Sequence, residues 1–173
     1  RRWTPACRFG KVLVELGGVE RRDAQLLVDP DAGTLRRALD ALSSEAARRP
    51  GSVVVFYYSG HADERALLLG DQAFPLVELQ AALAGVPARL RILLQDACHS
   101  GALTRTKGAR LGRTVAVSTR PESEGHVVIT SSAAFEEAQE SDRLQGSFFT
   151  LHLVAGLRGA ADRDRDGRVT IDE

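Results

Sequence analysis

Two short segments of the sequence carry a thiol and an imidazole in similar surroundings. Residues 91–101, RILLQDACHSG, contain Cys98 shortly after an apolar run, and residues 52–61, SVVVFYYSGH, end on His61 after another such run. A cysteine thiolate is a strong nucleophile, and a nearby imidazole can take its proton and later pass it to a leaving amine. His61 and Cys98 are therefore candidates for a base and a nucleophile.

The segments before these two residues have the pattern of strands buried on both faces. Residues 53–58 and 90–94 are short apolar runs, and the second run stops at Asp96. In an open parallel sheet, reactive groups lie just beyond the carboxyl ends of the strands. We therefore expect His61 and Cys98 beyond the ends of two strands, at one edge of a parallel sheet.

The composition narrows the class of protein. At 173 residues, with 43% hydrophobic residues, the chain suits one domain with a substantial core. Lys+Arg 23 balances Asp+Glu 23, which argues against nucleic acid or a membrane surface as partner. No apolar run approaches the roughly 18 residues of a membrane span, and the first residues form no signal-peptide core. Two cysteines, Cys7 and Cys98, argue against a disulfide framework and favour a cytoplasmic location.

Periodicity predicts an alternation of helices and strands. The expected elements are a helix from about Phe9 to Gly17, a strand over residues 25–28, a helix capped by Thr34, the strand at 53–58, a small hairpin or extension near 67–69, a helix around Leu76 to Leu83, the strand at 90–94, a strand at 126–130 and a helix over 147–157. Residues 102–125 have no clear pattern. The order predicts an α/β sandwich with a mainly parallel sheet.

Four segments resemble the caspase-like cysteine peptidases of family C14: YYSGH, DACHSG, HVVITSSAA and GSFFTLHLVAGL. The resemblance extends from about residue 9 to 159 and is closer to the metacaspase and bacterial branch than to animal caspases. It implies a three-layer sandwich, with His61 and Cys98 catalytic. It also implies a peptidase domain over residues 1–160, with a large-subunit-like part to about 104, a linker at 105–125 and a small-subunit-like part at 126–160.

The chemistry also needs donors for a developing oxyanion. The backbone N–H groups of Ala62 and Cys98 are the candidates, and such a donor typically contributes about 10²–10³ in rate. In the family a glycine usually follows the histidine, whereas this chain has Ala62. We therefore expect a methyl group in the site and an altered geometry of the hole.

Asp96 is the candidate for substrate selection. Animal caspases resemble one another in having Gln at this place, two positions before the cysteine. A buried carboxylate is costly without a partner, and a substrate Arg or Lys supplies one. The metacaspase branch likewise cleaves after Arg or Lys. The expected partners are thus proteins or peptides with a basic residue before the cleaved bond.

The linker contains basic residues that the enzyme itself could recognise. A long stretch without periodic burial is readily nicked, and it falls where caspase-like enzymes are divided into two subunits. The candidate self-cleavage positions are Arg105, Lys107, Arg110, Arg113 and Arg120.

Residues 161–173 have the spacing of an EF-hand calcium loop. Positions 1, 3, 5, 7, 9 and 12 of that twelve-residue pattern fall on Asp162, Asp164, Asp166, Arg168 (through its carbonyl), Thr170 and Glu173, with Gly167 at the turn. Ca²⁺ is the cofactor expected there, and the peptidase chemistry needs none. Three arginines in the segment oppose the cation, and the alternative is an acidic, solvated tail.

Other interpretations remain open. Cys98 could be an inert thiol, or His61, Cys98 and His99 could bind Zn²⁺, although adjacent Cys and His lack the usual ligand spacing. Asp96 could cap local backbone N–H groups. His126, His152 and Cys7 suit ordinary structural positions. The whole chain could be an inactive caspase homologue or a calcium-responsive interaction module. By family analogy, an active peptidase would serve regulated proteolysis in bacterial defence or cell death, alongside regulatory domains or subunits in a larger assembly.

Overall fold

The computed structural model describes residues 4–99, 125–131 and 147–170, with Cys98 and His99 described by their backbone alone. The chain divides into two compact units. One consists of Val28–Ala133, and the other combines Arg1–Leu27 with Ala134–Glu173.

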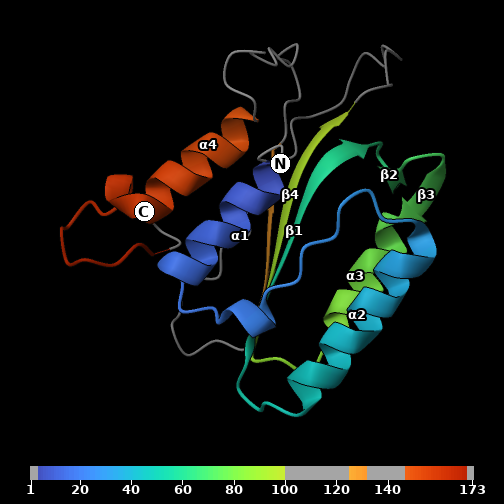
Figure 1. Ribbon diagram of the computed structural model, residues 1–173, viewed down its shortest axis with the longest axis horizontal. Coiled ribbons are helices and arrows are strands. Elements are labelled where there is room, and N and C mark those ends of the chain that lie inside the picture. The colour runs from blue at the N-terminus through green and yellow to red at the C-terminus, as the bar shows by residue number, and fades with distance from the viewer. Residues whose placement is uncertain (1–3, 100–124, 132–146, 171–173) are drawn as a thin grey trace. The chain divides into compact units, whose positions relative to one another are not determined.

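The first unit is built on a five-stranded mixed sheet with the strand order β3-β2-β1-β4-β5. The long strands β1 (Val53–Ala62) and β4 (Leu90–His99) run parallel to each other, and β5 (Gly125–Thr130) runs parallel to β4. The short strands β2 (Ala66–Leu69) and β3 (Gln72–Pro75) are antiparallel additions at the edge beside β1 (Figure 1). The apolar runs at residues 53–58 and 90–94 thus form the centre of the sheet.

Two helices of the same unit, α2 (Ala32–Ala47) and α3 (Leu76–Ala84), contact each other along one face of this sheet (Figure 1). Ala46 on α2 packs against Val54 on β1. Leu79 and Leu83 on α3 are almost completely buried. The i, i+3, i+4 spacing of apolar residues in both helices therefore supplies the core that holds β1 in place.

The second unit contains helices from both ends of the chain. Helix α1 (Pro5–Glu15) and helix α4 (Phe148–Ala155) contact each other. Thr4 and Ser147 cap their first turns by accepting hydrogen bonds from backbone N–H groups. A 3₁₀ turn, η1 (Arg21–Asp23), follows α1, and a five-residue π-helical segment, η2 (Gly156–Ala160), follows α4.

The predicted α/β class, with helices packed against a sheet, is confirmed. Two details of the prediction are wrong. Residues 25–28 form no strand, and Leu26 and Val28 are exposed because no neighbouring strand among the described residues pairs with them. Asp31, rather than Thr34, caps α2, since its carboxylate accepts the N–H of Thr34. The sheet is parallel over β1, β4 and β5, as expected, and the short antiparallel strands β2 and β3 make it mixed.

No helix in the described part of the chain is long and apolar enough to span a membrane.

Candidate active site

The register of β1 and β4 brings the two candidate catalytic positions next to each other. His61 is the partner of Cys98, and Ser59 is the partner of Asp96, in the parallel ladder. Partners in a parallel pair, and residues two apart on one strand, share a face of the sheet. Positions 59, 61, 96 and 98 therefore lie on one face, near the carboxyl ends of both strands.

Both strands continue through these residues instead of ending before them. The ladder between β1 and β4 extends as far as Ala62 and His99, and β2 pairs with β1 at His61 and Ala62. Pairing explains the extra length, because it satisfies backbone groups that a loop would leave to water. The end of β1 is paired with both β4 and β2, and the end of β4 is paired with β1. The expectation that His61 and Cys98 lie beyond the strand ends is therefore wrong by one or two residues.

The alternation of side chains also corrects the expectation for Ala62. Adjacent residues of a strand point to opposite faces, so the methyl group of Ala62 lies on the face opposite to His61. Ala62 is completely buried there. A methyl at this position does not enter the face that carries positions 61 and 98.

The backbone of His61 is held by the side chain of Tyr58. The phenol Oη of Tyr58 donates to the carbonyl oxygen of His61 at 2.7 Å and lies 3.2 Å from the carbonyl oxygen of Leu68 on β2. Burial raises the pKa of Tyr58, which keeps the phenol protonated as a donor. Tyr58 thus ties His61 to the neighbouring strand.

This contact depends on the absence of a side chain at Gly60. A Cβ atom at Gly60 would lie 2.7 Å from Oη and 2.9 Å from Cζ of Tyr58. Both distances are shorter than real Cβ contacts, so the phenol could not keep its place over an alanine. The glycine before His61 therefore makes room for the group that anchors the histidine.

A tight turn fixes the chain just after His61. The Oδ1 atom of Asp63 accepts the backbone N–H groups of Arg65 and Ala66, each at 2.7 Å, and Asp63 donates its own N–H to the carbonyl oxygen of Ala66. This side-chain turn joins β1 to β2 in three residues. It limits how far the end of β1 can move.

The carboxylate of Asp96 is buried, with 5% of its surface exposed, and is oriented by two hydroxyl groups. Oη of Tyr57 on β1 donates to Oδ2 at 3.2 Å, and Oγ of Ser131 just after β5 donates to Oδ1 at 3.5 Å. Donors from the two strands that flank β4 therefore fix the direction of this carboxylate. A carboxylate oriented in this way can accept hydrogen bonds from a guanidinium or an ammonium group.

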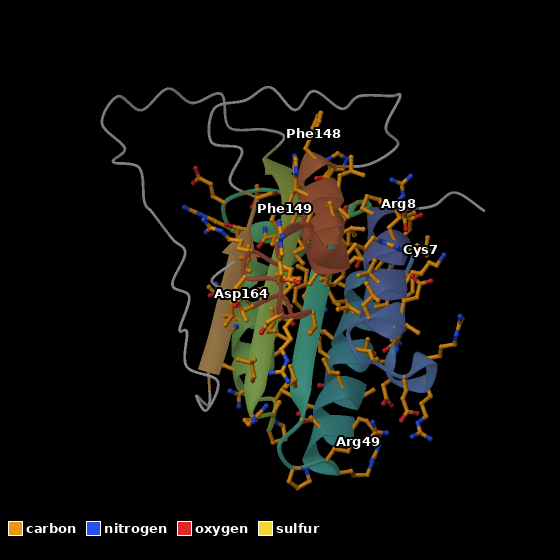
Figure 2. The ribbon with its side chains drawn as sticks, turned by 90° about the vertical axis from the view of Figure 1, so that its left-hand side faces the viewer. Cys7, Arg8, Arg49, Phe148, Phe149 and Asp164 are labelled. Atoms are coloured by element: carbon orange, nitrogen blue, oxygen red, sulfur yellow. The ribbon has the colours of Figure 1, made fainter. Side chains whose placement is uncertain are left out.

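The acidic segment after η2 forms a turn in which three carboxylates converge. Oxygens of Asp162, Asp164 and Asp166 all lie within 4.8 Å of one another. Asp162 accepts the N–H groups of Asp166 and Gly167, and Gly167 has a positive φ of 81°. Asp164 marks this segment in Figure 2. Arg168 and Thr170 follow it in the chain, and Glu173 lies outside the described residues.

Several predicted residues fall outside what the structure describes. The five candidate self-cleavage positions lie in the undescribed segment between residues 100 and 124. The side chains of Cys98 and His99 are likewise outside, which leaves the zinc alternative without a test. His126 lies on β5 in register with Arg91, and His152 lies on α4.

The prediction missed three residues that support the site, Tyr57, Tyr58 and Ser131, and it missed the room that Gly60 leaves for the Tyr58 ring. The alternation of side chains along a strand could have identified one of them, because Tyr57, Ser59 and His61 are spaced two apart on β1 and must share a face. The contact of Ser131 with Asp96 joins separate strands, and only the tertiary structure reveals it.

The backbone positions of His61 and Cys98 thus lie in register near the ends of two parallel strands, the region of an α/β sheet where reactive groups commonly lie. A family model for the caspase domain of peptidase family C14 matches residues 6–169. The chain therefore belongs to the caspase domain family, a family of cysteine peptidases. No curated protein and no solved structure matches it.

Proposed function

We propose that the protein is a cysteine endopeptidase in which Cys98 is the nucleophile and His61 is the general base. The observation that carries this proposal is the register of β1 and β4, which pairs position 61 with position 98 on one face of the sheet. His61 accepts the thiol proton, the thiolate attacks the peptide carbonyl, and the protonated imidazole gives its proton to the leaving amine. Water then releases the acyl group from Cys98.

The backbone N–H groups of Ala62 and Cys98 are the proposed donors to the oxyanion. Both belong to the last residues of paired strands, where the backbone is held firmly. Preorganised donors stabilise developing charge better than mobile ones. The buried methyl group of Ala62 helps to fix this end of β1 from the other face.

The proposed selectivity for Arg or Lys before the cleaved bond rests on Asp96. Its carboxylate lies two residues before Cys98 on the same strand and is oriented by Tyr57 and Ser131. A guanidinium can pair with both oxygens of a carboxylate, and an ammonium with one. The partner class is therefore peptides with a basic residue, and an acidic residue at that place would be repelled.

Hydrolysis of matched fluorogenic peptides tests the function. Peptides that differ only in a final Arg, Lys, Asp or Ala are compared for kcat/KM, with Cys98→Ala and His61→Ala as variants. Both variants should lose nearly all activity, and their effects should not add, because the two residues act as a unit. Asp96→Asn should lower cleavage after Arg by about tenfold or more while largely sparing the Ala peptide. Full activity of Cys98→Ala would refute the peptidase proposal.

We also propose that the segment after η2 binds Ca²⁺. Support comes from the convergence of Asp162, Asp164 and Asp166 and from the sharp turn at Gly167. Oxygen ligands at alternate positions suit this cation, with Arg168 contributing its carbonyl and Thr170 and Glu173 completing the set. Calorimetry should give a Kd of about 10⁻⁶ M or weaker, given the nearby arginines. Asp162→Ala should abolish the heat, and Asp40→Asn on α2 serves as the matched control.

Self-processing between residues 102 and 125 is a further proposal that rests on the peptidase function. Its support is the proposed preference for basic residues and the basic positions at 105, 107, 110, 113 and 120. Purified active protein should slowly yield two fragments, and mass spectrometry of the new ends places the cut. Cys98→Ala should stay intact, and cleavage of that variant at the same rate would rule out self-processing.

A further inference from the structure

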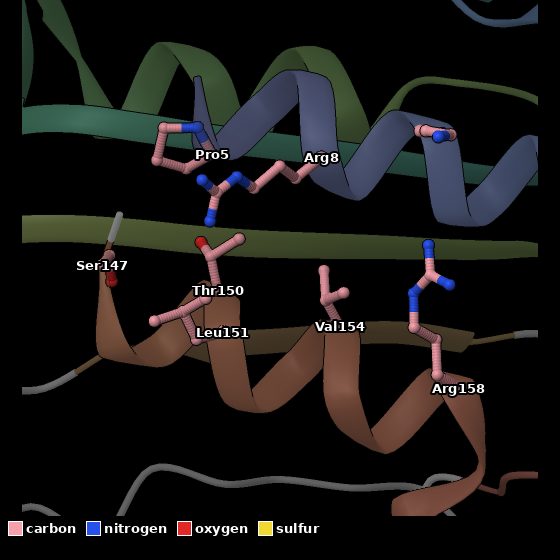
Figure 3. A pocket seen from close by; sticks show the side chains of 8 residues that line it. Pro5, Arg8, Ser147, Thr150, Leu151, Val154 and Arg158 are labelled. Atoms are coloured by element: carbon pink, nitrogen blue, oxygen red, sulfur yellow. The ribbon is translucent and has the colours of Figure 1, made fainter. Parts of the chain in front are cut away.

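A pocket of about 250 Å³ lies between helices α1 and α4, and all of its lining residues belong to the second unit. Its polar lining is cationic: Arg8 and Lys11 come from α1, and Arg158 comes from the π-helical segment η2. Figure 3 shows the guanidinium of Arg8 reaching toward Thr150 on α4 and the side chain of Arg158 directed toward α1. Segments from opposite ends of the chain thus direct positive groups into one pocket.

The charges around the pocket are unbalanced. Glu15 pairs with two of the cations, at 3.4 Å from Lys11 and 3.2 Å from Arg158. Arg8 has no carboxylate partner in the part of the chain that the structure describes, although it is partly buried. A guanidinium that no carboxylate neutralises can bind an anionic ligand through two parallel hydrogen bonds.

The remaining wall is mainly apolar. Pro5, Leu151 and Val154 contribute its apolar part, and Ser147 and Thr150, the latter with 1% of its surface exposed, add hydroxyl groups. An apolar wall with a few converging polar groups is the usual composition of a small-molecule site. The volume is below the roughly 300–1,000 Å³ of drug-sized sites, which restricts the ligand to a few heavy atoms.

The π-helical segment gives a structural reason for the position of Arg158. A glycine commonly ends a helix, because it adopts a positive φ without the strain that a Cβ atom would cause. Here Gly159, with a φ of 105°, interrupts the helical backbone directly after Arg158. This local geometry places the second arginine at the pocket.

We propose that this pocket binds a carboxylate carried on a short aliphatic chain. Arg8 binds the carboxylate, Lys11 and Arg158 add a favourable field, and the aliphatic part lies against Leu151 and Val154. The carboxylate can come from a free organic acid or from an acidic side chain of a peptide. This binding is independent of the peptidase chemistry, so it can be tested on an inactive variant.

The test is an NMR titration of the full chain carrying Cys98→Ala, with butanoate as the probe. Butan-1-ol and n-butylammonium, at constant ionic strength, are the controls for shape and charge. Butanoate should shift the amide signals of α1 and α4 with a millimolar Kd, whereas butylammonium should not. Raising the salt concentration should weaken the binding, because the attraction involves partly exposed charges.

Two substitutions that should change the affinity for butanoate in opposite directions make the test specific. Arg8→Gln should weaken butanoate binding by about tenfold, the loss expected for a hydrogen bond to a charged group. Glu15→Gln should strengthen it several-fold, because it removes the carboxylate that competes for Lys11 and Arg158. Arg89→Gln, a change at an exposed arginine outside the pocket, should leave the Kd unchanged.

Two peptides distinguish the sources of the carboxylate. A blocked tripeptide with a central Glu is compared with the same peptide carrying Gln. Binding of the Glu peptide at this pocket assigns the site to an acidic side chain, and binding of butanoate alone assigns it to a free acid. The proposal is overturned if neither carboxylate binds, if Arg8→Gln binds butanoate as well as the parent does, or if the shifts lie outside α1 and α4.

Discussion

The substitution Gly60→Ala tests whether the contact between Tyr58 and His61 organises the candidate active site. An alanine Cβ would lie 2.7 Å from Oη and 2.9 Å from Cζ of the Tyr58 ring. The optimum for such contacts is about 3.5–4.0 Å, so the ring has to move by on the order of 1 Å. That movement breaks the 2.7 Å hydrogen bond to the carbonyl oxygen of His61.

The size of the effect follows from three terms. Overpacking costs about 1–3 kcal/mol, and loss of the hydrogen bond costs about 0.5–1.5 kcal/mol. Replacing glycine in a strand recovers about 0.5–1 kcal/mol of chain entropy. We expect Gly60→Ala to lower the free energy of unfolding by about 1–3 kcal/mol. Because a misplacement of about 1 Å can cost up to 10²-fold, kcat should fall by about 10- to 100-fold.

The assay combines urea denaturation with steady-state kinetics on the Arg peptide. Gly10→Ala is the matched control, because a Cβ at Gly10 on α1 has nothing within 4 Å. That control should be neutral or slightly stabilising. A double-mutant cycle with Tyr58→Leu then isolates the clash, and Gly60→Ala should cost little once the ring is gone. The reasoning is refuted if Gly60→Ala is as harmless as Gly10→Ala, or if its cost is unchanged in the Tyr58→Leu background.

Two further predictions concern pH. Burial raises the pKa of Tyr58 above the ordinary value of 10.0. The stability that the protonated phenol contributes is therefore fully present below about pH 10 and is lost as the pH rises through the raised pKa. An absorbance titration of the parent against Tyr58→Phe checks this, and a phenol that titrates at or below pH 10 contradicts it. Hydrogen bonding to Arg36 lowers the pKa of Glu78 from 4.5, so the link that this pair makes between α2 and α3 is present above that pH and is lost as the pH falls through the lowered pKa. The coupling between Arg36→Gln and Glu78→Gln in a double-mutant cycle should therefore vanish in acid, and a coupling of equal size at neutral and acid pH would show that charge is not its source.

The sequence predicts the elements of the sheet well because their apolar runs need no tertiary information. Residues 53–58 and 90–94 are short continuous apolar runs of strand length, the pattern typical of strands in the centre of a parallel sheet. The prediction of a strand at residues 25–28 is wrong because it depends on tertiary information. A strand requires a neighbour, and nothing in the local pattern of Leu26 and Val28 reveals that no described strand pairs with it.

The sequence predicts which reactive residues form the candidate site, but it does not predict which residues hold them in place. The motifs around His61 and Cys98 identify the reactive groups, and the parallel sheet predicts that they meet. The sequence cannot say that both strands continue through the site, because that length depends on the pairing of β1 with β4 and with β2. Nor can it predict that Tyr57 and Ser131 orient Asp96, since these donors come from strands on opposite sides of β4.

Selective labelling of Cys98 tests the central claim most directly. The protein is treated with an arginine-derived peptidyl ketone electrophile, and the modified residue is identified by mass spectrometry. Cys7, half-buried on α1, is the other cysteine of the chain and serves as an internal control. We predict a single adduct on Cys98, formed far more slowly in His61→Ala and in Asp96→Asn. Labelling of Cys7 at an equal rate, or an unchanged rate in His61→Ala, would contradict the assignment of a His61–Cys98 catalytic pair.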